Sequence, residues 1–171
     1  MTYVPSRSRD ELRRSAHAKL LELSLPDHAG LPEIVSHVAT VTGKKIDVEP
    51  IGDKDWETIT GLVLQTDDSA TVLVRRSDPR WYQFHTVLHE LSHVVYGHTG
   101  CGTLPVVHPG HQHVRAGQTV LARGVASPDF DRLLDYSDRA AVMEAEAERL
   151  SQLLSKVVLR PRHERDEAVF G

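Results

Sequence analysis

The spacing of two histidines in the segment His89-Glu90-Leu91-Ser92-His93 constrains the fold of this chain more than any other feature. Residues four apart lie on one face of an α-helix, so a helix here lets both imidazoles bind a single metal ion. Glu90 lies one step round that helix, where its carboxylate can reach a water beside the ion without binding the ion. The motif therefore predicts a helix that carries part of a metal site and a candidate general base.

The chemistry that these residue types support best is zinc-assisted hydrolysis. Zinc lowers the pKa of a bound water to about 7, and a carboxylate can take the proton as the water attacks a peptide carbonyl. The alternative is a chance match inside an ordinary helix, and the flanking sequence argues against it. Asp78 and Pro79 are typical of a helix start, with Asp78 as N-cap and Pro79 at the first helical position. We expect the helix to run to about Tyr96 and to end at Gly97.

A catalytic zinc site needs a third protein ligand, which has to come from another element. Three acidic residues alternate near the C-terminal end of the chain, namely Glu144, Glu146 and Glu148. Glu144 and Glu148 share a helix face, whereas Glu146 lies about 200° round from Glu144 and is expected to face solvent. We therefore assign Glu144 as the third ligand and Glu148 as a hydrogen-bond partner that fixes the tautomer of a ligand imidazole. An acidic, solvent-facing side of an ordinary helix is the alternative.

The apolar pattern before the motif predicts two helices, an edge strand and a hairpin. Helical spacing predicts one helix over residues 10–23 and another from Leu31, with Pro32 in its first turn, to a stop at Gly43. Residues 45–51 alternate as a strand, and Pro50 places it at an edge because proline cannot donate to a ladder. Residues 59–65 and 70–75 are rich in β-branched and aliphatic side chains around a turn, which predicts an antiparallel hairpin.

After the motif the periodicity is weak, and residues 98–135 are predicted to be a long loop with a short strand at 114–122. This loop holds several histidines, which either approach the metal or are simply solvated. A last helix is predicted from residue 138 to about 159, capped by Ser137. Its apolar stripe consists of Met143, Ala147, Leu150, Leu154 and Val157.

The bulk composition excludes several classes of protein. The length of 171 residues fits a single domain over 1–171, with residues 1–9 as a flexible tail. A net charge of −4 provides no basic field for nucleic acid, and no segment reaches the roughly 20 apolar residues that span a membrane. The one cysteine, Cys101, allows no internal disulfide and fits a cytoplasmic protein. Cys101 is either a structural thiol or a redox switch.

The chain resembles the ImmA/IrrE family of zinc metallopeptidases over roughly residues 31–160. The resemblance rests on the segment Thr86-Val87-Leu88-His89-Glu90-Leu91-Ser92-His93, on Gly97-His98 after it, and on Glu144-Ala145-Glu146-Ala147-Glu148-Arg149-Leu150-Ser151-Gln152-Leu153-Leu154. This chain departs from the family at three positions. The family usually has Gly where this chain has Ser92, Phe where it has His85, and Asn or Asp where it has Glu148. On this match the third ligand of the family falls on Glu144. The resemblance implies a zincin-like α+β fold, with a small, mostly antiparallel sheet packed on helices, an active-site helix and a C-terminal ligand-bearing helix.

The function that this resemblance implies is that of a cytoplasmic zinc-dependent endopeptidase with one Zn²⁺ per chain. Its protein substrate would be a helix-turn-helix transcriptional repressor, whose cleavage switches on stress-response or mobile-element genes. One alternative is a regulatory binding module or toxin–antitoxin component, in which a fourth ligand such as His98 closes a structural zinc site. A metallopeptidase of broad specificity is the other.

Overall fold

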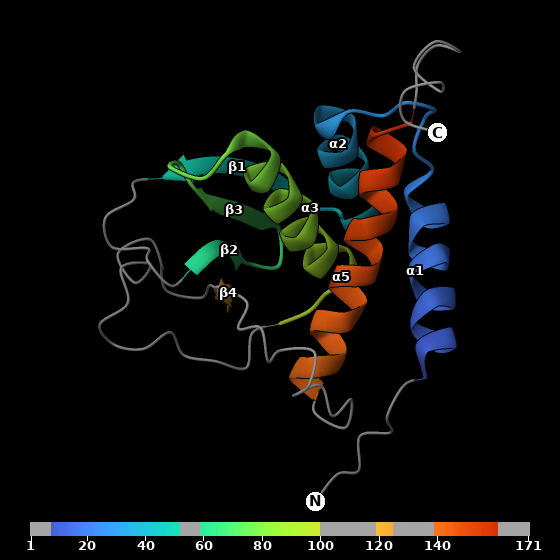
Figure 1. The fold of residues 1–171 in the computed structure, drawn as a ribbon. Helices are drawn as coiled ribbons and strands as arrows, with labels where there is room; N and C mark the ends of the chain where they lie inside the picture. Colours follow the sequence, from blue (N-terminus) through green and yellow to red (C-terminus); the bar gives the residue numbers. More distant parts are fainter. Residues whose placement is uncertain (1–7, 52–58, 100–118, 125–138, 161–171) are drawn as a thin grey trace, which may run out of the picture.

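The computed structural model describes residues 8–51, 59–99, 119–124 and 139–160, which form an α+β arrangement (Figure 1). The helices are α1 (Arg9–Leu23), α2 (Leu31–Thr42), α3 (Arg80–Tyr96) and α5 (Arg139–Val158). The strands are β1 (Lys45–Ile51), β2 (Ile59–Gln65), β3 (Ser69–Arg75) and β4 (Thr119–Gly124). No helix among these residues is both long enough and apolar enough to cross a membrane.

The strands form one mixed sheet in the order β1-β3-β2-β4. Strands β2 and β3 pair antiparallel, which confirms the predicted hairpin, and β4 pairs antiparallel with β2. Strand β1 lies at the edge, as Pro50 predicted, but pairs parallel with β3. The parallel pairing arises because β3 returns from the hairpin into the position between β1 and β2. Two of the three pairings are therefore antiparallel, and the sheet as a whole is mixed.

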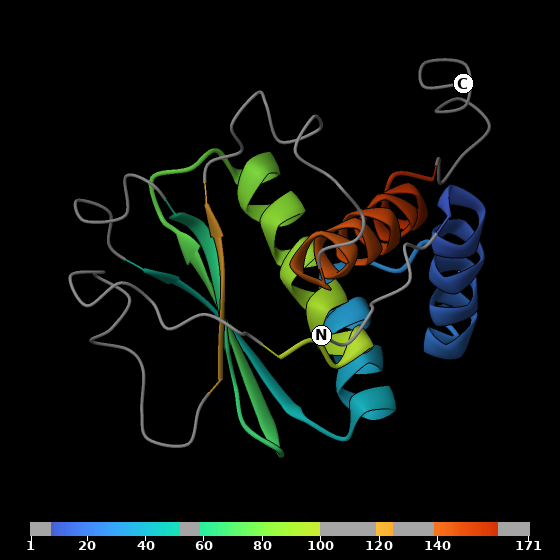
Figure 2. The same ribbon diagram turned by 90° about the horizontal axis from the view of Figure 1, so that it is seen from below.

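The helices stack on one side of the sheet, with α3 nearest to it. Figures 1 and 2 both show α3 between the sheet and α5, and α1 on the far side of α5. Contacts of α3 with β2, β3 and α5, and of α1 with α5, agree with this layering. The core between the layers is made of buried aliphatic side chains, among them Val63, Val72, Val74, Leu88, Leu91, Leu150 and Leu154. The motif helix is thus held on both sides by apolar contacts.

Sequence patterning predicted most element bounds to within a few residues. Helix α1 begins at Arg9, and Ser8 and Glu11 form a reciprocal capping box, so residues 8 and 9 of the expected 1–9 tail belong to the capped start of the helix. Residues 1–7 lie outside the described residues. Helix α3 begins one residue later than predicted, with Pro79 at the N-cap. Asp78 is not the cap, and its Oδ1 lies 2.6 Å from Nη2 of Arg75.

The predicted apolar stripe of α5 is confirmed, since all five of its residues are buried. Strand β4 overlaps the expected strand at 114–122. Most of the expected loop, at 100–118 and 125–135, lies outside the described residues, and with it Cys101 and residues 114–118 of the expected strand. The predicted cap Ser137 also lies outside them.

Candidate metal centre

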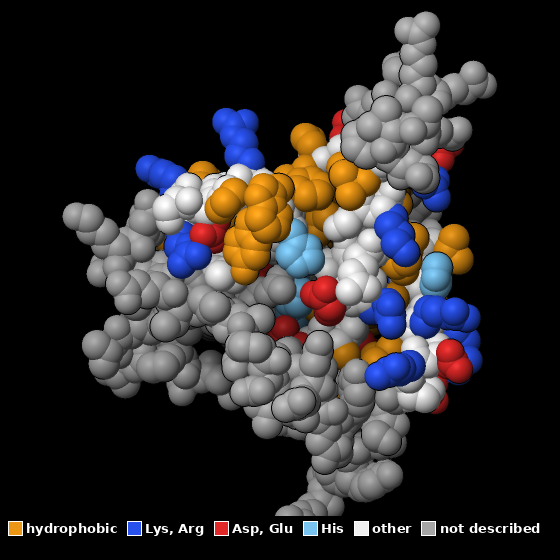
Figure 3. Space-filling view, viewed as in Figure 1, with side chains coloured by type: hydrophobic (Ala, Val, Ile, Leu, Met, Phe, Trp, Pro, Cys, Tyr) orange, Lys and Arg blue, Asp and Glu red, His pale blue; other side chains and the backbone are white. Residues whose placement is uncertain are grey.

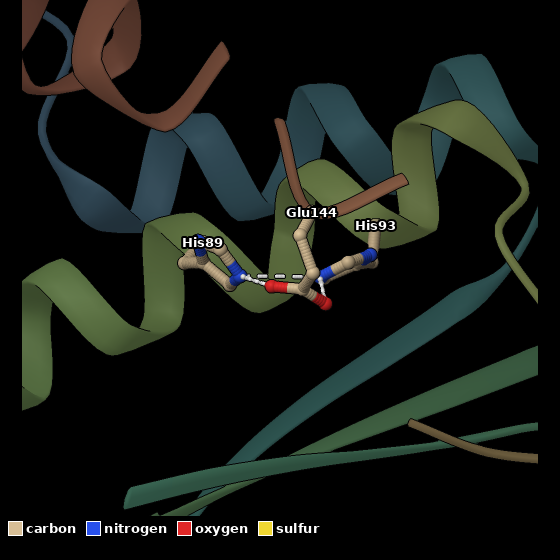
Figure 4. Close-up of side chains that lie close together, drawn as sticks. All are labelled: His89, His93 and Glu144. Atoms are coloured by element: carbon tan, nitrogen blue, oxygen red, sulfur yellow. Dashed lines mark hydrogen bonds and ion pairs between the residues drawn. The ribbon is translucent and has the colours of Figure 1, made fainter. Parts of the chain in front are cut away.

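Helices α3 and α5 bring three side chains of the predicted site together. Figure 4 shows the Glu144 carboxylate of α5 directed at the rings of His89 and His93, which project from one face of α3. The Nε2 atoms of the two imidazoles are 3.1 Å apart. Glu144 Oε2 lies 3.2 Å from Nε2 of His89, and Glu144 Oε1 lies 3.3 Å from Nε2 of His93.

This group can hold one metal ion. One ligand atom from each of the three residues lies within 4.8 Å of the others. The donor set is two imidazole nitrogens and a carboxylate oxygen, a combination that suits a divalent cation of intermediate softness. Both imidazoles are 2% exposed, whereas the Glu144 side chain is 30% exposed. Glu144 is therefore the most exposed of the three side chains.

The surface view agrees with this placement. In Figure 3, histidine and acidic side chains reach the surface together in the middle of the face on which Figure 1 places α3 beside α5. Hydrophobic side chains lie next to them. These surface side chains lie near the junction of α3 and α5, the two helices that carry the ligand group.

The charge of Glu144 suits a ligand. Burial raises the pKa of its carboxyl group, but hydrogen bonds with His89 and His93 outweigh that effect and hold the pKa well below its usual value. The carboxyl group is therefore ionised at neutral pH, as a metal ligand has to be.

Glu90 lies on α3 outside the ligand group, as expected for a base that does not bind the ion. It is 1% exposed, and its side chain lies next to Gly61 of β2. A Cβ atom added to Gly61 would lie 2.9 Å from Glu90 Oε1 and would also overlap Cγ2 of Thr86. Only glycine at position 61 lets the strand pass this close to the carboxylate. The sequence pattern alone did not indicate this role for Gly61.

Glu148 lies next to the His89 imidazole, on the side of the ring opposite the ligand group. Its Oε2 atom is 3.4 Å from Nδ1 of His89, the ring nitrogen that faces away from the ligand group. Glu148 thus lies within ion-pair distance of this nitrogen, and its role in orienting the ligand imidazole stays a prediction.

The prediction that Glu146 faces solvent is wrong. Glu146 is 7% exposed, and its Oε2 atom lies 3.1 Å from Nε2 of His98. The chain turns back at the end of α3 and brings His98 against Glu146 on α5. The side of α5 that carries Glu146 is therefore covered by protein and not by solvent.

His98 lies behind the second ligand imidazole. Its Nδ1 atom is 2.8 Å from Nδ1 of His93, and its ring stacks on Tyr96 with the ring centroids 5.1 Å apart. Burial lowers the pKa of His98, and the hydrogen bond with Glu146 works in the opposite direction. His98 is not in the ligand group, because it contacts the ring nitrogen of His93 that lies opposite the ligand atom. The signal in the sequence was Gly97, which ends the helix next to a histidine.

No family model, curated protein or solved structure matches this chain. The resemblance to the ImmA/IrrE family therefore stays a prediction carried by the motif segment and the α5 segment. What the described residues establish is a group of two histidines and one glutamate that can hold a metal ion.

Proposed function

We propose that this protein is a zinc-dependent endopeptidase whose ion is held by His89, His93 and Glu144. The observation that carries the proposal is the convergence of three ligand atoms within 4.8 Å from two helices whose ligands are up to 55 residues apart. Two histidines and one glutamate are a ligand set of catalytic zinc sites, which keep a further position for water. When bound, zinc polarises the scissile carbonyl and lowers the pKa of a water to about 7.

Glu90 is the general base in this proposal. It takes a proton from the attacking water, whose oxygen adds to the carbonyl carbon of the scissile peptide. It then passes that proton to the nitrogen of the leaving amine as the C–N bond breaks. The burial of Glu90 beside Gly61 supports this role, because a carboxylate held by packing keeps one orientation.

The remaining residues of the centre keep the ligands in place. Glu144 remains ionised, and Glu148, whose Oε2 is 3.4 Å from Nδ1 of His89, would orient that imidazole. An extended substrate segment would pair with an edge strand of the sheet, and β4 lies at the edge of the described sheet.

The substrate class rests on the resemblance. A zincin-like member of the ImmA/IrrE family would act in the cytoplasm on a helix-turn-helix transcriptional repressor and so induce stress-response or mobile-element genes. The α+β architecture, with the motif helix between a small sheet and the helix that carries Glu144, supports this proposal.

A structural zinc site in a regulatory binding module would be closed by four protein ligands. The ligand group found among the described residues contains three, and His98 contacts a different atom of His93. His98 therefore does not close a structural site on this ligand group.

Replacing the base while keeping the ligands tests the proposal. In Glu90→Gln we expect the zinc content to be unchanged and the cleavage rate of a helix-turn-helix repressor encoded near the gene to fall by about 10²–10⁴-fold, the usual contribution of a general base. Metal analysis of the purified chain and gel-based cleavage of that repressor are the measurements.

Glu49→Gln is the matched control, because it removes the same charge from an exposed position on β1. It should retain both zinc and cleavage. A parent chain without zinc, or a Glu90→Gln chain that cleaves as fast as the parent, would show that the proposal is wrong.

A further inference from the structure

His98 and Glu146 form a buried pair that the proposed reaction does not use. Each is 7% exposed, although both side chains are polar. His98 Nε2 lies 3.1 Å from Glu146 Oε2, and His98 Nδ1 lies 2.8 Å from His93 Nδ1. An unbroken line of hydrogen-bonding atoms therefore connects Glu146 on α5 to a proposed metal ligand on α3.

The protonation pattern along this line follows from the ligand group. His93 Nε2 faces Glu144 and His89, so the lone pair on that nitrogen is the one that can bind an ion. A neutral imidazole with a free Nε2 lone pair carries its proton on Nδ1. His93 Nδ1–H then donates to His98 Nδ1, which leaves the proton of a neutral His98 on Nε2.

Glu146 is what makes that pattern favourable. Its carboxylate can only accept, and it faces Nε2 of His98. The His98 tautomer with its proton on Nε2 therefore has a partner for each ring nitrogen. The opposite tautomer would set two N–H groups against each other between the rings and would leave the carboxylate facing a lone pair.

Packing contacts also restrict the position of His98. It stacks on Tyr96 with an interplanar angle of 7°. The backbone carbonyl of His98 accepts a hydrogen bond from Nε2 of Gln65 on β2 at 3.1 Å. The sheet thus holds the backbone of His98, while Tyr96 on α3 and Glu146 on α5 hold its imidazole.

We propose that Glu146, acting through His98, is a positioning residue that holds His93 in the tautomer that binds the metal ion. This inference rests on the proposed zinc centre. It assigns α5 three tasks: Glu144 binds the ion, Glu148 orients His89 directly, and Glu146 orients His93 through a second imidazole. Orienting partners of this kind commonly change metal affinity by about 10–100-fold.

The test compares two substitutions of similar size at position 146. Glu146→Leu fills the space but removes the acceptor, and Glu146→Gln keeps an acceptor oxygen without the charge. We expect the zinc dissociation constant, measured by competition with a chromophoric chelator, to rise about 10–100-fold in Glu146→Leu and by less than roughly tenfold in Glu146→Gln. Glu49→Gln on β1 is the control for charge and should match the parent.

A spectroscopic readout separates positioning from packing. In the zinc-loaded chain with ¹⁵N-labelled histidine, ring-nitrogen NMR should show the proton of His98 on Nε2 and that of His93 on Nδ1. In Glu146→Leu we expect His98 to lose this single tautomer. A role in packing alone would lower the melting temperature without changing the tautomers.

The other possible results either overturn the positioning role of Glu146 or show whether it fails independently of the proposed peptidase activity. A folded Glu146→Leu chain with parental zinc affinity and tautomers overturns the positioning role alone. If that variant does not fold, Glu146→Ala is measured in the same way. A parent that binds no zinc overturns both proposals, whereas a parent that binds zinc but cleaves nothing overturns the peptidase and leaves the positioning role to the affinity data.

Discussion

Gly61 lies in β2 where the sheet comes closest to the Glu90 carboxylate. A side chain at this position would overlap Cγ2 of Thr86 and would lie 2.9 Å from Glu90 Oε1. The absence of a side chain therefore allows α3 to pack closely on the sheet at the position of Glu90, the proposed base. A single atom added at this contact would affect both the packing and the position of that carboxylate.

The substitution Gly61→Ala tests both effects. We expect a loss of about 1–3 kcal/mol in the free energy of unfolding, because an added methyl group overpacks a buried contact. Cleavage should fall, since the Glu90 carboxylate has to move, while zinc content stays at the parental value. Urea unfolding, metal analysis and cleavage kinetics are the measurements.

A second substitution separates the two contacts of that methyl group. Thr86→Ser removes Cγ2, so the Gly61→Ala/Thr86→Ser chain should regain part of the stability but not the activity, because the contact with Glu90 remains. Full activity in Gly61→Ala would mean that the position of the carboxylate beside β2 is unimportant for the reaction.

The end of helix α3 sets the place of His98. Gly97 adopts a left-handed conformation with a φ of 66°. Its N–H donates to Val94 O at 3.0 Å, and the N–H of His98 donates to His93 O at 3.0 Å. This is the pair of hydrogen bonds of a Schellman motif, which ends the helix and turns the chain back. One glycine thereby brings His98 against the ring of His93.

Replacing the two helix-ending glycines compares this turn with an equivalent one elsewhere. Gly43 ends α2 with a φ of 69°, close to the 66° of Gly97, and neither position has an atom within 4 Å of an added Cβ. We expect Gly43→Ala and Gly97→Ala each to lose about 1–2 kcal/mol of stability, the cost of a left-handed conformation for a residue with a Cβ. Thermal unfolding measures this.

Only the second of these variants should also bind zinc more weakly. If the turn shifts, His98 moves away from His93, and the ligand loses the partner that orients it. Chelator competition on both variants gives the comparison. Equal zinc affinities in the two variants would indicate that the turn at Gly97 matters for helix stability alone.

The whole molecule places its proposed ligands on two helices that pack against each other. His89 and His93 belong to α3, Glu144 belongs to α5, and buried leucines join the two helices below them. An ion bound to all three ligands therefore holds α3 and α5 together. Binding to the folded chain alone has to stabilise it by mass action.

Zinc should accordingly raise the melting temperature. At a free zinc concentration 100 times the dissociation constant, the gain is about 2.7 kcal/mol. For a chain of this size this corresponds to roughly 5–10 °C. Calorimetry with zinc, and again after addition of EDTA, measures the shift. In Glu144→Gln the shift should be much smaller, and an equal shift there would place the bound zinc at other histidines of the chain.

Patterns within a few residues of one another were sufficient to predict most elements of the fold. Helical periodicity, glycine stops and the turn between two apolar strands depend on local backbone and solvent preferences, so they can be read from neighbouring residues. The edge position of β1 followed from Pro50, which cannot donate to a ladder. The parallel pairing of β1 with β3 was not predictable in this way, because it depends on where the hairpin returns.

The metal centre also depends partly on local sequence and partly on tertiary structure. Its first part is the pair His89 and His93. The four-residue spacing of these histidines by itself determined that they share a helix face beside Glu90, because residues four apart in an α-helix lie on the same side. Helical geometry also selected Glu144 and Glu148. Only the tertiary structure decided that Glu146 is buried against His98 and that Gly61 lies against Glu90, since segments far apart in the sequence determine which sides of a helix are left to solvent.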